Sequence, residues 1–132
     1  MVDTGILYAL ADRRDAWHAR ARDYLRKHPQ TLLAPVTVLP EVAYLMRERI
    51  GGQAEAAFVA SLANGEIAVE DLAESDLKRA ESVMTVYGEL GFVDASIVAM
   101  TERLKLSMLA TTDRRHFGAV RPAHIERFTL VP

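Results

Sequence analysis

The chain contains no cysteine, a single tryptophan and no long apolar run. Without thiols it can form neither disulfides nor thiolate-bound zinc or iron–sulfur sites, and it is compatible with a reducing compartment. No stretch approaches the roughly 18 uncharged residues of a membrane span, and no secretory leader is visible, so we expect a cytoplasmic protein without a membrane partner. The formal net charge is only −2, so any nucleic-acid partner must be held by a local basic patch.

What is present is the composition of an ordinary globular protein. Half of the residues are hydrophobic and 26% are charged. A chain of 132 residues can bury roughly two-thirds of its unfolded surface around one core. We therefore expect a single domain that spans residues 1–132.

Short apolar runs alternate with segments of helical periodicity along the whole chain. Strands are expected at residues 1–2, 32–36, 67–72, 107–110 and 125–131. Helices are expected at 5–10 (capped by Thr4), 15–27, from Pro40 to Gly51, 53–63, from a Ser75 cap to about residue 90, and from Asp94 onward. This alternation predicts an α/β fold with a central parallel sheet of about four to five strands flanked by helices.

Four acidic residues follow apolar runs or lie at expected helix starts, namely Asp3, Glu41, Asp94 and Asp113. In a parallel sheet these places lie at the rim formed by the carboxyl ends of the strands. Their apolar neighbours indicate that the carboxylates are partly buried, and buried acids need partners. Several converging carboxylates stay ionised only if a cation joins them, and oxygen ligands favour a hard divalent metal.

Each acid taken alone also has a purely structural interpretation. Asp94 before an apolar helical stretch is a good N-cap, which contributes about 1 kcal/mol. Glu41 beside Pro40 suits the positive end of a helix dipole, Asp3 can cap the following helix, and Asp113 can form a turn with a local ion pair. These interpretations stay open at the level of sequence.

The triplet Asp3-Thr4-Gly5 also occurs at the active site of aspartic proteases. Those enzymes are β-rich and bring two such triplets together, whereas this chain has one triplet and is mostly helical. A haloacid-dehalogenase phosphatase would need a second aspartate where Gly5 stands. No phosphate-binding glycine–lysine loop and no glycine-rich dinucleotide turn is present.

Four segments resemble the motifs of PIN-domain proteins, in the same order and at similar spacing. They are Val2 to Leu10, Val38 to Val42, Asp94 to Ala99 and Leu109 to Phe117. The resemblance covers nearly the whole chain, and the size is most similar to that of the VapC toxins of bacterial toxin–antitoxin pairs.

This resemblance implies a PIN fold with Asp3, Glu41, Asp94 and Asp113 around a magnesium or manganese ion. It implies hydroxyl groups near the metal at Thr4 and Thr112. It also implies an endoribonuclease that hydrolyses RNA phosphodiesters as the toxin of a type II pair and is held inactive by a small VapB-type antitoxin. Two alternatives are a PIN nuclease in RNA processing without a toxin role and a non-catalytic PIN-fold interaction module.

Basic residues must hold an RNA backbone. Arg114 and Arg115 adjoin Asp113 and are the nearest candidates for RNA binding. The arginine-rich run at 13–27 is either a solvated helix face or an RNA contact, and Trp17 within it is expected to be a packing residue. All four histidines are expected to be structural or surface residues. The resemblance also implies a homodimer, for which the apolar residues of 52–62 and 77–90 are candidate surfaces.

Overall fold

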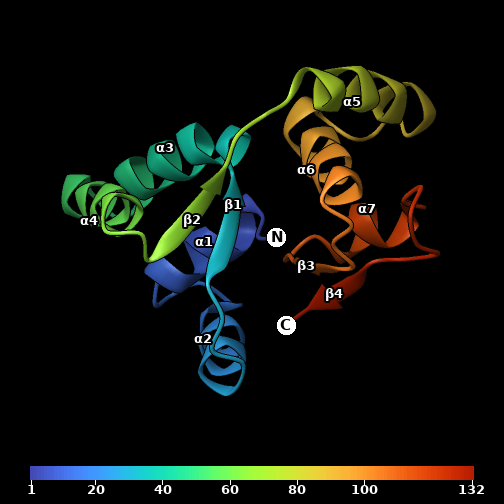
Figure 1. Cartoon of the computed structure of the whole chain (residues 1–132). Helices are drawn as coiled ribbons and strands as arrows, with labels where there is room; N and C mark the ends of the chain where they lie inside the picture. Colours follow the sequence, from blue (N-terminus) through green and yellow to red (C-terminus); the bar gives the residue numbers. More distant parts are fainter.

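The computed structural model describes all 132 residues (Figure 1). The helices are α1 (Thr4–Ala11), α2 (His18–Lys27), η1 (Val36–Val38), α3 (Leu39–Arg49), α4 (Gly52–Ala63), α5 (Glu74–Val86), α6 (Phe92–Arg103) and α7 (Arg114–Ala119). The strands are β1 (Leu32–Pro35), β2 (Ile67–Glu70), β3 (Met108–Ala110) and β4 (Thr129–Val131). None of the helices combines the length and apolar character needed to cross a membrane.

The strands form two parallel pairs, β1 with β2 and β3 with β4. The first residues of the chain join the pairs: the Val2 amide donates to Leu33 at 3.0 Å, and the Asp3 amide donates to Ala110 at 2.9 Å. The spatial order is therefore β2, β1, the N-terminal segment, β3, β4, and the N-terminus lies between the two pairs (Figure 1). The α/β architecture is confirmed, and the short strand tail expected at the N-terminus is a single parallel bridge at Val2.

Several expected boundaries were wrong. The N-cap of α1 is Asp3 and not Thr4. The N-cap of α5 is Ala73, whose amide donates to the Asp76 carboxylate at 2.8 Å, so Ser75 is not the cap of this helix. The last strand is shorter than expected, since only 129–131 pair with β3. Sequence periodicity also missed α7, because six residues are too few to show it.

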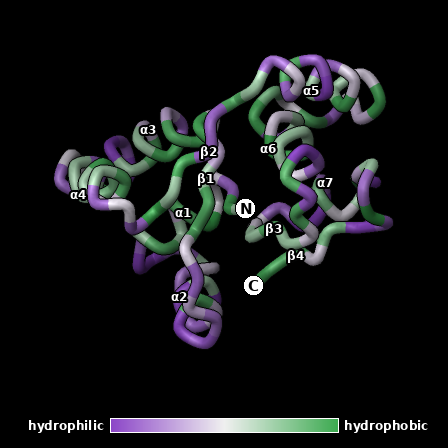
Figure 2. Tube along the Cα trace, viewed as in Figure 1, coloured by the Kyte–Doolittle hydropathy of each residue, from purple (hydrophilic) through white to green (hydrophobic).

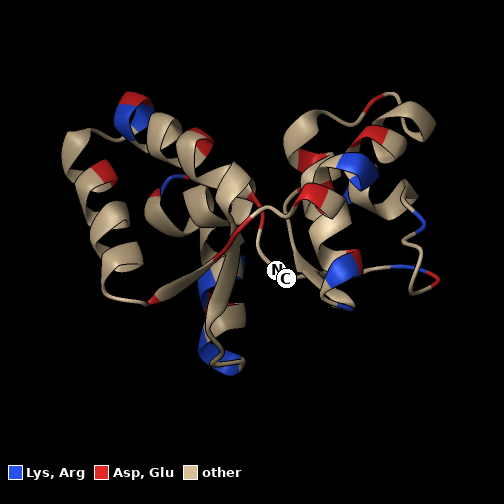
Figure 3. Cartoon of the chain, turned by 45° about the horizontal axis from the view of Figure 1, so that its top comes forward, with Lys and Arg blue, Asp and Glu red and all other residues tan.

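The core lies where the helices pack on the short sheet. Val2, Ile97, Leu109 and Phe117 have at most 1% of their surface exposed. Apolar residues follow the strands, whereas α2 is largely polar (Figure 2). Lysine and arginine gather along α2 at one end of the molecule (Figure 3).

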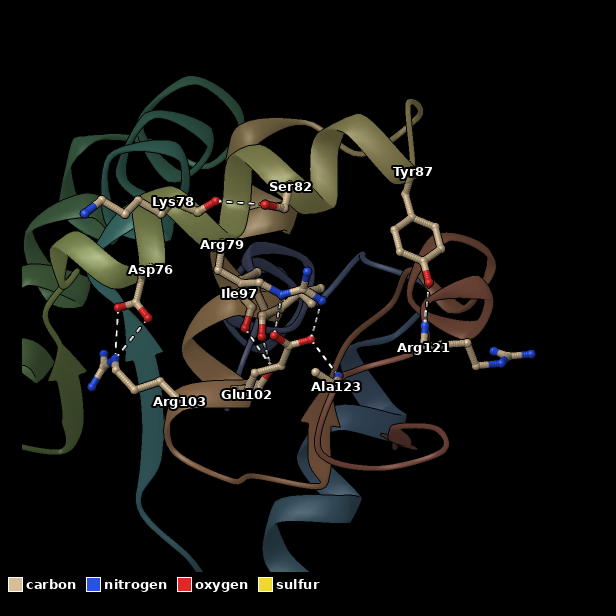
Figure 4. A network of polar contacts seen from close by, with 12 residues as sticks. Asp76, Lys78, Arg79, Ser82, Tyr87, Ile97, Glu102, Arg103, Arg121 and Ala123 are labelled. Atoms are coloured by element: carbon tan, nitrogen blue, oxygen red, sulfur yellow. Dashed lines mark hydrogen bonds and ion pairs between the residues drawn. The ribbon is translucent and has the colours of Figure 1, made fainter.

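Two ion pairs hold α5 against α6 (Figure 4). The Arg103 Nε donates to the buried Asp76 carboxylate at 3.0 Å. The Arg79 Nε donates to Glu102 at 2.6 Å, and Glu102 also accepts from the Ala123 amide at 2.8 Å. Because partly buried charges are costly unless paired with good geometry, this network favours one placement of α6. That helix carries Asp94.

Candidate active site

The four acids arrive from separate elements. Asp3 follows the N-terminal segment and caps α1, Glu41 lies in the first turn of α3, Asp94 lies in the first turn of α6, and Asp113 caps α7 after β3. The pKa of Asp3 is raised to about 6: burial is the largest cause, the negative charges of Asp94 and Asp113 add to it, and hydrogen bonds from Thr111 and Ile6 oppose it. This mutual repulsion means that the tertiary structure gathers the carboxylates at one rim.

Asp94 is the acid without a protein partner. The N-cap of α6 is Gly91, so the capping interpretation of Asp94 is wrong. Burial raises the pKa of Asp94, as do the charges of Asp113 and Glu41, while His116 lowers it. No hydrogen bond contributes to that shift, and no cationic side chain forms an ion pair with the carboxylate. A half-buried carboxylate that faces other carboxylates in this way needs an external cation.

Thr111 links two of the acids and was missed by sequence reasoning. Its fully buried hydroxyl donates to the Asp3 carboxylate and accepts from the Asp113 amide at 2.8 Å. The signal was available, since a threonine two positions before an aspartate commonly forms such a local turn. The sequence had instead predicted that the neighbouring Thr112 supplies the hydroxyl near the site.

The two hydroxyls expected near the site behave differently. The Thr4 hydroxyl donates to Glu41 at 2.8 Å. Thr112 packs on the first turn of α1, where a Cβ added to Gly5 would lie 2.1 Å from its Oγ1. Glu41 itself is exposed, so its expected burial was wrong. The first turn of α3 directs the neighbouring Val42 into the core and leaves Glu41 facing outward.

Asp113 also contacts His116, one helical turn further on. Its carboxylate accepts from the His116 amide at 2.9 Å and lies 2.6 Å from the imidazole Nδ1. The spacing of an N-cap and its third residue permits this contact, which agrees with the expectation that the histidines are structural or surface residues. The half-buried imidazole therefore orients one of the four acids.

The two arginines after Asp113 diverge. The Arg115 guanidinium forms an ion pair with Glu89 at 3.3 Å. Arg114 donates to the Pro132 carbonyl and lies over the Trp17 ring, 5.7 Å from its centroid. The two candidates for RNA binding thus occupy different surroundings.

The donor set suits a hard divalent ion, because it offers carboxylate and hydroxyl oxygens and no thiolate. No three histidine or acidic side chains are already arranged as a closed metal-binding group. Magnesium commonly keeps several of its waters and is bound through one or two carboxylates, so an open arrangement fits it. The residues present therefore fit a water-rich ion and do not fit a fully dehydrated one.

Comparison with known proteins places this site in a family. The PIN domain family profile matches residues 1–121. The chain is 31% identical over 134 residues to Ribonuclease VapC26 of Mycobacterium tuberculosis, with 100% of this chain and 99% of the relative covered. The chain therefore belongs to the PIN-domain family and is VapC-like within it.

Solved structures show the same fold. The first is M. tuberculosis VapC20, described as a toxin that cleaves the sarcin–ricin loop, with a TM-score of 0.82, 23% identity and coverage of 94% of this chain and 96% of that one. The second is a DNA-bound VapBC from Salmonella typhimurium, with a TM-score of 0.72, 16% identity and coverage of 98% and 96%. A toxin–antitoxin complex from Klebsiella pneumoniae has a TM-score of 0.70, 19% identity and coverage of 99% and 94%. At these identities the likeness defines the fold alone.

Proposed function

We propose that this protein is a metal-dependent endoribonuclease that hydrolyses RNA phosphodiester bonds as the toxin of a type II toxin–antitoxin pair. Membership of the PIN-domain family and the name of the relative Ribonuclease VapC26 support the activity. The rim of four carboxylates supports the chemistry, since an anionic substrate can approach it only when a cation offsets the charge.

The observation that carries this proposal is the state of Asp94. The Asp94 carboxylate lies in the first turn of α6 near Asp113 and Glu41, and no hydrogen-bond donor or ion pair within the protein compensates it. Structural acids elsewhere in the chain are paired, as Asp76 and Glu102 are. Asp94 is therefore best explained as a ligand for magnesium or manganese.

Each acid has a distinct task in this scheme. Asp3, Asp94 and Asp113 hold Mg²⁺ or Mn²⁺ directly or through water, and Glu41, kept in place by Thr4, completes the shell or orients the attacking water. When bound, the ion neutralises the phosphodiester and lowers the pKa of a coordinated water. Thr111 keeps Asp3 and Asp113 in register, and Thr112 lines the same rim beside Gly5.

RNA is held beside this rim by basic side chains. Arg114 and Arg115 directly follow Asp113 and are both exposed, which supports a role in holding a bound strand. Phosphate contacts of this kind supply most of the affinity for a nucleic acid independently of its sequence.

The partners are a small VapB-type antitoxin and a second copy of the chain. The structural neighbours described as a VapBC and a toxin–antitoxin complex support the first partner. Exposed apolar side chains on the two helices expected to form the dimer support the second, namely Val59 on α4 and Leu77, Met84 and Val86 on α5. Exposed apolar patches are typical of protein interfaces.

The test is cleavage of a random RNA library by the wild-type chain, with Mg²⁺, with Mn²⁺ and with EDTA. Asp94→Asn should lower the rate by about 100-fold or more, as expected for removal of a group that stabilises charge in the transition state. Glu126→Gln, which alters an exposed acid far along the chain, is the matched control. Full activity in EDTA, or an Asp94→Asn variant as active as wild type, would overturn the proposal.

A further inference from the structure

The Trp17 ring gathers two arginines from distant parts of the chain. The guanidinium carbon of Arg20, on α2, lies 5.1 Å from the ring centroid, and that of Arg114, on α7, lies 5.7 Å from it. Both distances are within the range of cation–π attraction. The arrangement brings the basic helix α2 into contact with the residue that follows Asp113.

We propose that Arg20 and Arg114, held on Trp17, form a phosphate clamp that grips the RNA backbone next to the acidic rim. This inference rests on the proposed ribonuclease function and deepens it. It adds to the site a tryptophan and an arginine from a segment that the sequence left open between a solvated helix face and an RNA contact.

The two arginines of the clamp differ in the partners they already have. Arg20 forms no ion pair, whereas Arg114 donates to an oxygen of Pro132, the last residue of the chain. Other arginines nearby are neutralised by side chains, since Arg115 pairs with Glu89 and Arg26 pairs with Asp23 at 3.6 Å. Two guanidinium groups on one ring attract an anion that approaches that ring.

The acids closest in sequence to the clamp do not supply that anion. The Asp15 carboxylate accepts from the Trp17 amide at 2.8 Å and serves the turn before α2. Asp23 is engaged by Arg26. A phosphate group can occupy the clamp, because arginine forks bind phosphate oxygens in pairs and both arginines are exposed to the solvent.

The contact with Trp17 also distinguishes Arg114 from Arg115, the two arginines that follow Asp113. Arg114 is supported by an aromatic ring, whereas Arg115 must leave Glu89 before it can bind a phosphate. The clamp therefore predicts that Arg114 contributes more to RNA affinity than Arg115 does.

The experiment measures binding of a fluorescent single-stranded RNA as a function of salt, in full-length protein carrying Asp94→Asn to prevent cleavage. Arg20→Gln and Arg114→Gln should each weaken binding about 5-fold or more and lower the slope of log affinity against log salt by about 0.7, the value for one lost phosphate contact on a single strand. Arg22→Gln is the matched control on the same helix, because Arg22 is exposed and lies off the ring. It should leave the slope nearly unchanged.

Trp17→Phe keeps an aromatic ring and should retain most of the affinity, whereas Trp17→Leu should behave like the arginine variants. Circular dichroism of each variant excludes unfolding as the cause. Arginine variants with the parental slope would overturn the clamp while leaving RNA cleavage by the wild-type chain intact. A wild-type chain that neither binds nor cleaves RNA would overturn both the clamp and the proposed function.

Discussion

Thr111 holds Asp3 and Asp113 together through one buried hydroxyl. Such a neutral link is needed because the two acids repel each other and no arginine or lysine enters between them. The donated hydrogen bond lowers the pKa of Asp3 but does not offset the effect of burial. The hydroxyl thus keeps Asp3, a proposed metal ligand, in position without neutralising it.

Thr111→Val should destabilise the protein by about 1–3 kcal/mol, because an isosteric methyl leaves one oxygen of the buried Asp3 carboxylate and the Asp113 amide without a partner, while the other Asp3 oxygen keeps the Ile6 amide. Urea unfolding in EDTA measures the loss. Thr101→Val is the control, since its buried hydroxyl donates to carbonyls of its own helix and should cost less. Equal losses of unfolding free energy for the two variants would show that the hydrogen bonds of Thr111 stabilise the fold no more than those of Thr101.

For single residues, the sequence identified which side chains belong to the candidate site better than it identified the contacts they make. Asp3, Glu41, Asp94 and Asp113 stand in places that strand and helix patterns make visible, and the structure brings their charges together. The roles of Thr111 and His116 depended on side-chain directions after a short strand, which periodicity does not encode. The burial of Glu41 was misjudged for the same reason.

Between elements, α1 packs closely against the segment after β3. Gly5 lies in the first turn of α1, and Thr112 occupies the space where a Cβ would stand. Rotation of the threonine would move its Oγ1 but not its Cβ, which would lie 3.2 Å from the new methyl carbon. Glycine at this position is therefore a packing requirement of the site.

Gly5→Ala should destabilise the protein and reduce its response to Mg²⁺, although alanine favours a helix over glycine by about 1 kcal/mol. Gly52→Ala is the matched control, because Gly52 also lies at a helix start and has no atom within 4 Å of the added carbon. Thermal unfolding with and without Mg²⁺ tests both variants. The double variant Gly5→Ala/Thr112→Ala should recover stability; a single Gly5→Ala variant as stable as the Gly52→Ala variant would refute the packing argument.

The elements themselves were largely predictable. Long periodic segments such as α4 and α5 were identified with small errors at their ends. The short α7 and the three-residue β4 were missed or overextended, since their length is set by partners far along the chain. The ion pairs between α5 and α6 were likewise invisible, because they join residues more than 20 positions apart.

For the whole molecule, the acidic rim couples stability to pH. The folded state raises the pKa of Asp3 from 3.8 to about 6, so it binds this proton more tightly than the unfolded chain does. That stabilisation is complete below about pH 4 and is lost as the pH rises through about 6. Asp94 acts in the same direction. Asp12 acts in the opposite direction, because hydrogen bonds from the Arg14 backbone and side chain lower its pKa to about 2. Its effect on stability is confined to the range below about pH 4.

In EDTA the free energy of unfolding should therefore fall by up to about 3 kcal/mol between pH 4 and pH 7 from Asp3 alone. Asp3→Asn should remove most of this fall. Mg²⁺ should restore stability at pH 7 and have little effect at pH 5, where protons compete for the same carboxylates. Urea titrations across this range provide the measurement, and an identical pH profile for wild type and Asp3→Asn would contradict it.

The sequence by itself determined the α/β class, the order of the elements and the four acids that follow apolar runs. These properties depend on local periodicity and on the rule that strand ends meet at one rim, so neighbouring residues suffice to reveal them. Only the tertiary structure decided that Asp94 has no protein partner, that Thr111 joins Asp3 to Asp113, and that Arg20 and Arg114 both contact the Trp17 ring. Those contacts connect residues distant along the chain, and side-chain packing in three dimensions selects them.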